Sequence, residues 1–483
     1  MTLSASLASA LSGLNAAARG AETVSNNIAN ATTPGYGRRA VTLAANTLGG
    51  AGQGVMVTGV LRDVDTVLLG DRRRAEAQEA ADAADAAAWR RIEAALGTAG
   101  TGTSLAARVD RLDAALVTAA GRPDSEAYLE GVLDAAAGLV ATIRGAGAAV
   151  QTARTAADRA IAADVALLNA SLSEVERINS QIRMIAATGR DPSALMDQRQ
   201  AAIDRIAPIV PIRQVERPFG QVALFTPTGA TLLDGRAVPF GFTGVGTVTA
   251  TMTRAGGALS AVTQAGLTLE AGPGDPLAGG RLAANLALRD DGLPAAQAAL
   301  DTLARDLVER FSDPAADPTL PAGAPGLFTD AGAAFNPALE TGLAQRLAVN
   351  SLVDPAAGGA LWRLRDGIGA PVPGPVGAST GLLRLGDAIA ASRTVGVPPV
   401  PRALPALAAG VTAEVATRRI AAEDRAGFSG ALAAALRDET AAGGVDTDRE
   451  LQDMLRLERA YAANARVLQA VDRMLETLLG IRR

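Results

Sequence analysis

Carboxylates are the main side chains in this sequence that could carry out catalysis, because the chain contains neither histidine nor cysteine. Imidazole and thiolate chemistry, disulfides and most transition-metal sites are therefore excluded. Asp290 and Asp291 are candidates for the paired carboxylates of a wall hydrolase. Adjacent residues on a helix point apart, however, whereas a catalytic pair must converge across a cleft. A solvated or capping role is therefore favoured, and we expect no enzymatic activity, no cofactor and no metal.

The glycines at 50, 52 and 54 are a second candidate for binding chemistry, because their spacing is similar to that of a phosphate-binding loop. Such a loop follows a strand and opens a helix. No strand is expected before these glycines and no helix after them. A turn that precedes a strand is therefore favoured.

The composition points to a helical protein without a polyanionic partner. The 483 residues include 45 Lys and Arg against 50 Asp and Glu, a formal net charge of -5. No arginine-rich run with interleaved aromatics is present, which disfavours nucleic acid as a partner. The N-terminus has no secretory signal pattern, and no apolar run approaches the roughly 20 residues of a membrane span. We expect no cleaved signal peptide and no membrane insertion.

The N-terminal segment has the pattern of one amphipathic helix that must pack against a partner. Its apolar and small residues recur at alternating steps of four and three, as in a coiled-coil seam: Leu3, Leu7, Ala10, Leu14, Ala17, Ala21, Val24 and Ile28. Asn30 tolerates a left-handed helix end, and Pro34 with Gly35 favours a turn. Gly13 and Gly20 each cost about 1 kcal/mol relative to alanine inside a helix.

The C-terminal segment carries a matching seam. Its residues are Met454, Leu457, Tyr461, Asn464, Leu468, Val471, Leu475 and Leu478. Pairing of the two terminal helices would bring the chain ends together, with Asn464 as a buried polar residue that fixes the register. The first helix is nearly uncharged before Arg19, so it has more apolar surface than one partner covers. Neighbouring copies of the chain are expected to bury the rest.

The residues expected at this interface between copies lie in both terminal segments. They are Leu3, Leu7, Leu11, Leu14, Val24, Asn26, Asn27, Ile28, Asn30, Pro34, Gly35, Tyr36, Met454, Leu457, Tyr461, Asn464, Leu468, Val471, Leu475 and Leu478. The asparagine amides are expected to satisfy the last carbonyls of the helix and to bond neighbouring copies. Changing Asn27 and Asn30 to Leu is therefore expected to prevent assembly before it prevents folding.

The middle of the chain alternates between helical and irregular patterns. Apolar periodicity predicts helices at 72–96, 105–116, 128–144, 161–182, 294–311 and from Val411 onward. Loop and short strands are predicted for 36–61. Strand-like alternation at 221–225 and 244–251 predicts a β-rich insertion. Clustered prolines predict a loop-rich region at 313–405, with weak helices near Leu343 and Leu361.

Motifs at both ends resemble one protein family. Residues 11–17 read LSGLNAA, 25–30 read SNNIAN and 33–36 read TPGY. This run resembles the N-terminal signature of the bacterial flagellar rod, hook and hook-associated proteins. Residues 444–451, GVDTDREL, and 461–467, YAANARV, resemble the closing helix of that family. Internally, LMDQR at 195–199 and GGRL at 279–282 resemble the helical domain of hook-associated members.

The resemblance implies a mainly α fold with β insertions (α+β), paired terminal coiled-coil helices, a helical middle and a small β-rich outer domain. We expect a terminal assembly domain, a rod-like helical domain with a short β segment, a β-rich insertion and a loop-rich region. Their predicted limits are 1–36 plus 445–483, 37–209 plus 283–312 and 406–444, 210–282, and 313–405.

The function implied by the resemblance is that of a structural subunit at the junction between flagellar hook and filament, polymerising through its terminal helices. A hook or distal-rod subunit is the alternative, and a flagellar-assembly enzyme is less favoured. The implied partners are further copies in a ring, the hook protein, a second junction protein on the filament side, and the export chaperone and gate. The implied location is extracellular, after type III export without a cleaved signal.

Overall fold

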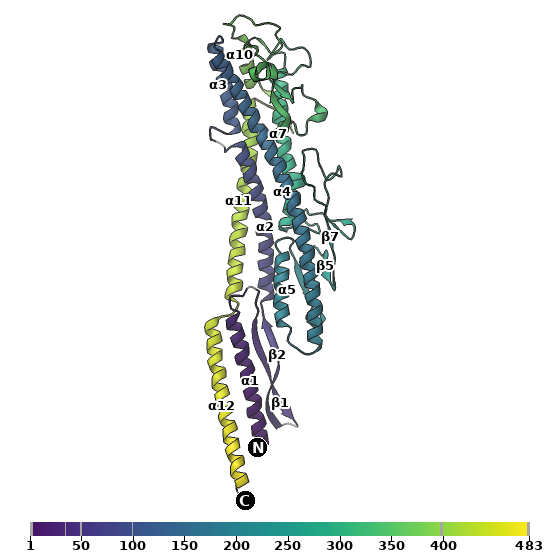
Figure 1. Ribbon diagram of the computed structural model, residues 1–483, viewed down its shortest axis with the longest axis vertical. Coiled ribbons are helices and arrows are strands. Elements are labelled where there is room, and N and C mark those ends of the chain that lie inside the picture. The colour runs from purple at the N-terminus through teal and green to yellow at the C-terminus, as the bar shows by residue number, and fades with distance from the viewer. Residues whose placement is uncertain (1–2, 34, 49–50, 99, 397–398, 481–483) are drawn as a thin grey trace. The chain divides into compact units, whose positions relative to one another are not determined.

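The computed structural model describes residues 3–33, 35–48, 51–98, 100–396 and 399–480, with only the backbone at 48, 51 and 478–480. The chain divides into two compact units. Unit 1 comprises 1–79, 166–240 and 429–483, and unit 2 comprises 80–165 and 241–428. The predicted fold class, mainly α with β insertions, is confirmed (Figure 1). The predicted limits of the four domains stay a prediction.

Helices form most of both units, and α2, α4 and α11 contribute residues to both. Their bounds are α1 Leu3–Ala29, α2 Thr66–Leu96, α3 Leu105–Gly121, α4 Glu126–Ala187, α5 Ser193–Ile206, α6 Gly280–Ala287, α7 Leu293–Ser312, α8 Leu343–Arg346, α9 Trp362–Asp366, α10 Thr380–Ala390, α11 Leu404–Ala442 and α12 Thr447–Gly480. A π-helical turn, Leu288–Gly292, joins α6 to α7.

The strands are short except for the first two. Their bounds are β1 Arg38–Leu48, β2 Ala51–Asp63, β3 Arg213–Glu216, β4 Val222–Phe225, β5 Thr231–Asp234, β6 Arg236–Ala237, β7 Phe240–Gly241, β8 Thr263–Gln264, β9 Leu267–Thr268, β10 Phe328–Asp330, β11 Leu347–Val349, β12 Arg393–Val395 and β13 Val400–Arg402. In unit 1, β3, β4, β5 and β6 form an antiparallel sheet in that order.

The long helix α4 replaces two predicted helices. The sequence predicted separate helices at 128–144 and 161–182, but the chain is helical throughout Glu126–Ala187. Buried alanines at 146, 153 and 157 continue the apolar row between the two stretches, and alanine is the best helix former. By length and composition one window of α4 could cross a membrane. Its row of apolar residues, however, packs inside the protein.

The segment predicted as loop and short strands is a long hairpin. β1 and β2 pair in antiparallel register from Arg38 opposite Asp63 to Leu48 opposite Ala51. The register shifts between Thr42 and Leu43 and again between Ala45 and Thr47. The prediction that no strand precedes the glycines was wrong, because β1 leads directly into them. Residues 49 and 50 lie outside the described residues.

The predicted strand at 244–251 is also wrong, because helix side chains bond its backbone in place of a neighbouring strand. Val245 N donates to Asp158 Oδ2 at 2.7 Å and Val248 N donates to Thr155 Oγ1 at 3.0 Å. Arg154 Nη1 donates to Thr249 O at 3.0 Å. These donors and acceptors come from α4, so the segment is held against a helix in unit 2 as irregular structure.

The proline-rich region packs against the helical core of unit 2. The weak helices expected near Leu343 and Leu361 are present as α8 and α9, whereas α10 was not predicted. Phe328 of β10 packs edge to face against Phe311 of α7, with the ring centroids 5.0 Å apart. This places strand β10 on the helical core.

A buried ion pair supports the end of α7 in unit 2. Arg310 and Asp306 are 2% and 0% exposed, with Arg310 Nη2 lying 2.9 Å from Asp306 Oδ2. Arg310 also donates to the carbonyls of Ala388 and Ala391, at and beyond the end of α10. Burial raises the pKa of Asp306, although Arg310 and Arg393 oppose the shift.

Replacing Arg310 by Met is expected to destabilise unit 2 by about 3–5 kcal/mol, because it removes the closer cation of the buried Asp306 carboxylate and leaves it with Arg393, whose Nε lies 3.3 Å away. The loss should shrink at acidic pH, where Asp306 is protonated in the folded chain. Arg305→Met is the control, because Arg305 pairs with Glu309 on the same helix but is 43% exposed; less than about 1 kcal/mol is expected. Urea unfolding followed by tryptophan fluorescence measures this unit, which contains both Trp89 and Trp362. Equal losses in the two variants would contradict the prediction.

Candidate assembly interface

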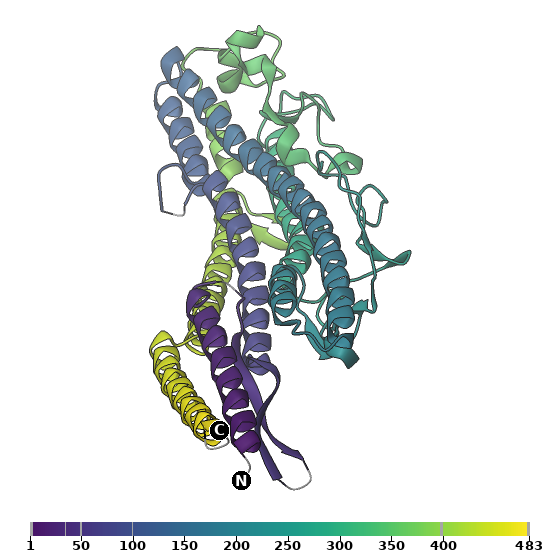
Figure 2. The ribbon, with the colours of Figure 1, turned by 60° about the horizontal axis from the view of Figure 1, so that its bottom comes forward.

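The two terminal helices pack side by side in unit 1, as the sequence predicted (Figures 1 and 2). Two glycines of α1 allow the close approach. A Cβ at Gly13 would lie 2.7 Å from Asn464 Nδ2, and a Cβ at Gly20 would lie 2.7 Å from Leu457 Cδ2. The glycines that weaken α1 as an isolated helix are therefore the positions at which α12 contacts it.

The predicted interface residues are only partly buried within one chain. Val24, Asn27 and Val471 are buried, whereas Leu7, Leu11, Tyr461 and Leu475 are exposed. The expectation that Asn464 is buried was wrong: it is half-buried, and its amide donates to Ala460 O of its own helix. The half-buried members are Leu3, Leu14, Ile28, Met454, Leu457 and Leu468. Pro34 and the side chain of Leu478 lie outside the described residues.

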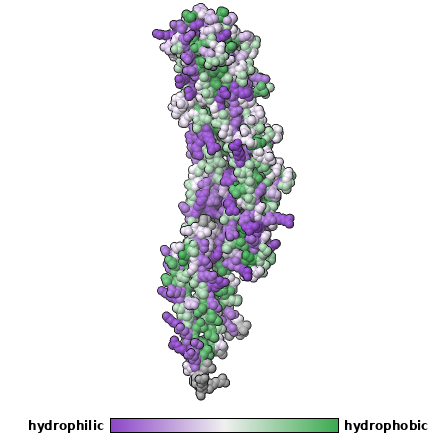
Figure 3. Space-filling view, viewed as in Figure 1, coloured by the Kyte–Doolittle hydropathy of each residue, from purple (hydrophilic) through white to green (hydrophobic). Residues whose placement is uncertain are grey.

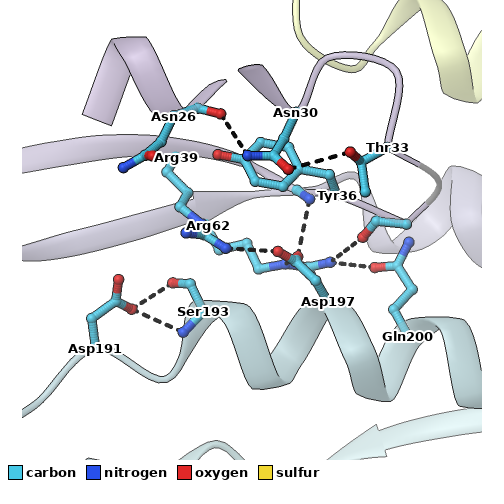
Figure 4. Close-up of polar contacts among 12 residues, drawn as sticks. Asn26, Asn30, Thr33, Tyr36, Arg39, Arg62, Asp191, Ser193, Asp197 and Gln200 are labelled. Atoms are coloured by element: carbon cyan, nitrogen blue, oxygen red, sulfur yellow. Dashed lines mark hydrogen bonds and ion pairs between the residues drawn. The ribbon is translucent and has the colours of Figure 1, made fainter. Parts of the chain in front are cut away.

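The end of α1 is formed by side chains of the predicted motif (Figure 4). Asn30 Nδ2 donates to Asn26 O at 2.9 Å, which confirms that an asparagine amide satisfies one of the last carbonyls. Thr33 Oγ1 donates to Asn30 Oδ1 at 3.2 Å. Gly35 has a φ of 79°, which favours glycine. The helix therefore stops where its sequence provides the turn.

Asn27 is the centre of a buried hydrogen-bond network. Its Nδ2 donates to Arg39 O at 2.8 Å and to Glu450 Oε2 at 2.9 Å. Its Oδ1 accepts from Arg39 N at 3.0 Å and from Tyr36 OH at 2.9 Å. Both amide donors and both acceptor sites are therefore used within the chain. The expectation that Asn27 bonds neighbouring copies is wrong for this residue, because no hydrogen-bonding capacity remains.

Glu450 brings the start of α12 into this network. It is fully buried, and its second oxygen accepts from Arg38 Nε at 2.7 Å. Asp446 caps the same helix end by accepting from the backbone N–H groups of Asp448 and Arg449.

Burial raises the pKa of the Tyr36 phenol above its ordinary value, so the phenol stays protonated as the donor to Asn27.

Asp197 of α5 joins the turn and the hairpin to the rest of unit 1 (Figure 4). Its Oδ1 accepts from Gly37 N at 3.0 Å and from Arg62 Nε at 2.7 Å, and its Oδ2 accepts from Arg39 Nη2 at 2.8 Å. A Cβ at Gly37 would lie 2.5 Å from Arg62 Nε, so a side chain there would displace Arg62 from Asp197. Arg62 also donates to Gln200 Oε1.

The predicted site residues omitted the charged partners of this network. Arg38, Arg39, Arg62, Asp197 and Glu450 were outside the predicted set. The available signal was the Arg38-Arg39 pair directly after the turn, which needs acidic partners when half-buried. Sequence spacing alone could not identify those partners, because Asp197 and Glu450 lie far along the chain.

The packed terminal segments still expose apolar side chains, and apolar patches are visible on the face shown in Figure 3. The side chains in α1, the hairpin and α12 that are at least one third exposed are Leu7, Leu11, Leu43, Met56, Val57, Leu61, Leu451, Leu455, Tyr461, Val467, Met474 and Leu475. Scattered exposed leucines are ordinary, but this number in three adjoining elements is typical of an interaction surface.

One of the two carboxylate candidates is paired with an arginine. Both oxygens of Asp290 accept from Arg289, at 2.8 and 2.9 Å, whereas Asp291 is exposed. Among the described residues, no group of three or more acidic side chains is placed to hold a metal ion.

Changing Asn27 to Leu is expected to loosen the network in the isolated chain. The change leaves Glu450 and the amide of Arg39 with one partner fewer, and a buried group without a partner costs about 1–3 kcal/mol. We expect the Arg39 amide to exchange at least about tenfold faster with solvent. Asn26→Leu is the control, because Asn26 precedes it on the helix with an exposed side chain. Equal exchange rates in the two variants would contradict the role of Asn27.

Comparisons with known proteins agree with this geometry. A family model described as the flagellar hook-associated protein FlgK helical domain matches residues 89–319. The model described as flagella basal body rod protein matches residues 7–36, and that of the flagellar basal body rod FlgEFG protein C-terminal matches residues 442–481. The last two matches cover the two helices that pack together.

The curated relatives that match this chain share one name. Flagellar hook-associated protein 1 of Salmonella typhimurium is 29% identical over 233 residues, which is 47% of this chain and 42% of the relative. The Escherichia coli protein of that name is 27% identical over 240 residues, 48% of this chain and 44% of the relative. The chain thus matches less than half the length of these curated relatives.

Among solved structures, the flagellar hook junction protein FlgK from Burkholderia pseudomallei aligns with a TM-score of 0.44 at 20% identity, covering 54% of this chain and 46% of that chain. The family models and the curated relatives confirm the resemblance predicted from the motifs at both ends: this chain is similar to the flagellar rod, hook and hook-associated proteins and, among them, to hook-associated protein 1.

Proposed function

We propose that the protein is a structural subunit of the bacterial flagellum that forms the junction between hook and filament and polymerises through its terminal helices. The observation that carries this proposal is the apolar surface left on the packed α1, α12 and hairpin. The rod-type family models match most of α1 and all of α12. Burial of such surface contributes about 25 cal/mol per Å². Further copies of the same chain are the partners that would cover it in a ring.

The helical middle favours the junction over other positions in the flagellum. A hook or distal-rod subunit is the second candidate, because the rod-type matches at both ends suit it equally. The match of residues 89–319 to a hook-associated helical domain favours the junction. The hook protein and a second junction protein on the filament side are then the expected neighbours along the axis.

The proposal places the protein outside the cell, after export through the flagellar type III pathway with an export chaperone and without a cleaved signal. An enzymatic role is disfavoured because Asp290, the best carboxylate candidate, is engaged by Arg289. Nucleic acid and membrane lipid are not expected partners. The interface residues predicted from the sequence, other than Asn27, stay part of the proposal.

Deleting the gene is expected to leave complete hooks without attached filaments, because a junction subunit is needed only after the hook is finished. Electron microscopy of the deletion strain measures this directly, and a plasmid copy of the gene should restore filaments. Absence of the hook in the deletion strain would favour the rod or hook alternative and refute the junction role.

Leu11→Glu is expected to abolish filament attachment without unfolding the chain. Leu11 is 51% exposed on α1, so a charge there should cost the monomer less than about 1 kcal/mol but should prevent apolar burial between copies. Leu267→Glu is the matched control, because Leu267 is 71% exposed on β9, outside the terminal helices. Counting hooks with filaments in strains carrying each variant gives the result. Normal attachment with Leu11→Glu would exclude this face from the interface.

A further inference from the structure

An aromatic side chain of unit 1 is presented to solvent on a strained loop. Phe219, between β3 and β4, has φ 60° and ψ 32°, the left-handed region that residues with a Cβ disfavour. The residue is 66% exposed, so burial within the chain does not explain a phenylalanine there. Glycine would adopt the same conformation without strain. Strain that persists at an exposed position points to a functional constraint.

The loop around Phe219 is held in place on both sides. Arg217 N donates to Gln221 O at 2.8 Å across its base. Arg199 Nη1 donates to Gly220 O at 2.6 Å and to Asn179 Oδ1 at 3.0 Å. Burial lowers the pKa of Arg199 to about 10, so its guanidinium remains charged at neutral pH. The ring of Phe219 is therefore preorganised, and little further ordering is needed if a partner buries it.

The same unit contains a cavity suited to an aromatic ring. It has a volume of about 570 Å³ and lies between the start of α2 and strand β3. Its apolar walls are Val67, Leu69, Ile212 and Pro227. Aromatic side chains that fill apolar cavities are the commonest anchors of protein interfaces.

A buried guanidinium in this cavity has an unused N–H group. Arg73 is 3% exposed; its Nε donates to Asp204 at 2.7 Å and its Nη1 donates to Gln214 at 3.1 Å. Its Nη2 is buried and has no hydrogen-bond partner among the described residues. The face of an aromatic ring carries partial negative charge and attracts a guanidinium. Because only 3% of Arg73 is exposed, a phenylalanine ring in the cavity would contact its apolar walls and lie beside the charged guanidinium.

We propose that Phe219 of one copy inserts into the cavity formed by Val67, Leu69 and Arg73 of a neighbouring copy. This inference rests on the proposed function, because it requires that copies polymerise. The contact joins two different patches of the chain, and such a heterologous contact builds a ring when the rotation between copies closes. Within one copy, the fixed loop keeps Phe219 exposed and outside the cavity.

Cysteine cross-linking tests the contact directly, because the natural chain contains no cysteine. Two differently tagged copies, one with Phe219→Cys and one with Val67→Cys, are expressed together in the deletion strain. Isolated flagellar segments are then oxidised. We expect a heterodimer that carries both tags, since a disulfide requires the two Cβ atoms to lie about 3.5–4.5 Å apart. The terminal helices should still hold the copies together in these variants.

The control pairs Phe219→Cys with Leu267→Cys, because Val67 and Leu267 are similarly exposed, at 72% and 71%. This pair should give no heterodimer. Absence of the Val67 heterodimer, or an equal yield with Leu267, would overturn the contact. Cross-linking of Phe219→Cys to a different flagellar protein in place of its own copy would also overturn it.

Phe219→Gly separates the contact from folding. The substitution removes the ring and relieves the backbone strain, so the melting temperature should not fall, while the fraction of hooks with filaments should fall at least severalfold. Phe219→Ala, which keeps the strain, should show the same loss of attachment. Normal attachment in both variants would refute the contact while bare hooks in the deletion strain still supported the junction role. The cross-linking result tests the contact between copies whether the chain builds the junction, the hook or the distal rod.

Discussion

A single buried amide, that of Asn27, holds the two ends of this chain in one arrangement. An asparagine side chain has two donors and two acceptor sites, and here all four are used by three separate segments. The bonds form only if α1 ends near Asn30, β1 starts at Arg38 and α12 begins before Glu450. A buried polar group without partners is costly, so the network favours this register over others.

The geometry also separates two roles within one polar motif. Neighbouring asparagines on a helix face in different directions, so Asn27 is buried in the network while Asn26 is exposed. The bonding capacity of Asn27 is fully used within the chain, whereas the exposed Asn26 is available to another molecule. The segment 25–30 therefore has one buried asparagine that bonds within the chain and one exposed asparagine that faces solvent.

The close packing of α1 on α12 explains why apolar surface remains for assembly. Glycines at 13 and 20 bring the two helices together along one face only. Leu7 and Leu11 lie outside that contact and stay exposed. In unit 1, Phe219 and the cavity beside α2 add the second proposed contact, outside the terminal helices. Together these features fit a subunit whose folded form is completed by further copies.

The sequence by itself determined the two paired terminal helices, the turn after Asn30, the helical character of the middle and the family resemblance, because these depend on local periodicity, caps and motifs. It did not determine the single helix through residues 126–187, because alanine gives a weak apolar signal. It also did not determine the irregular backbone of residues 244–251, because the partners of this segment are side chains of α4. It also missed Asp197 and Glu450. Their importance arises from burial beside arginines far away in the sequence, and only the tertiary structure brings those charges together.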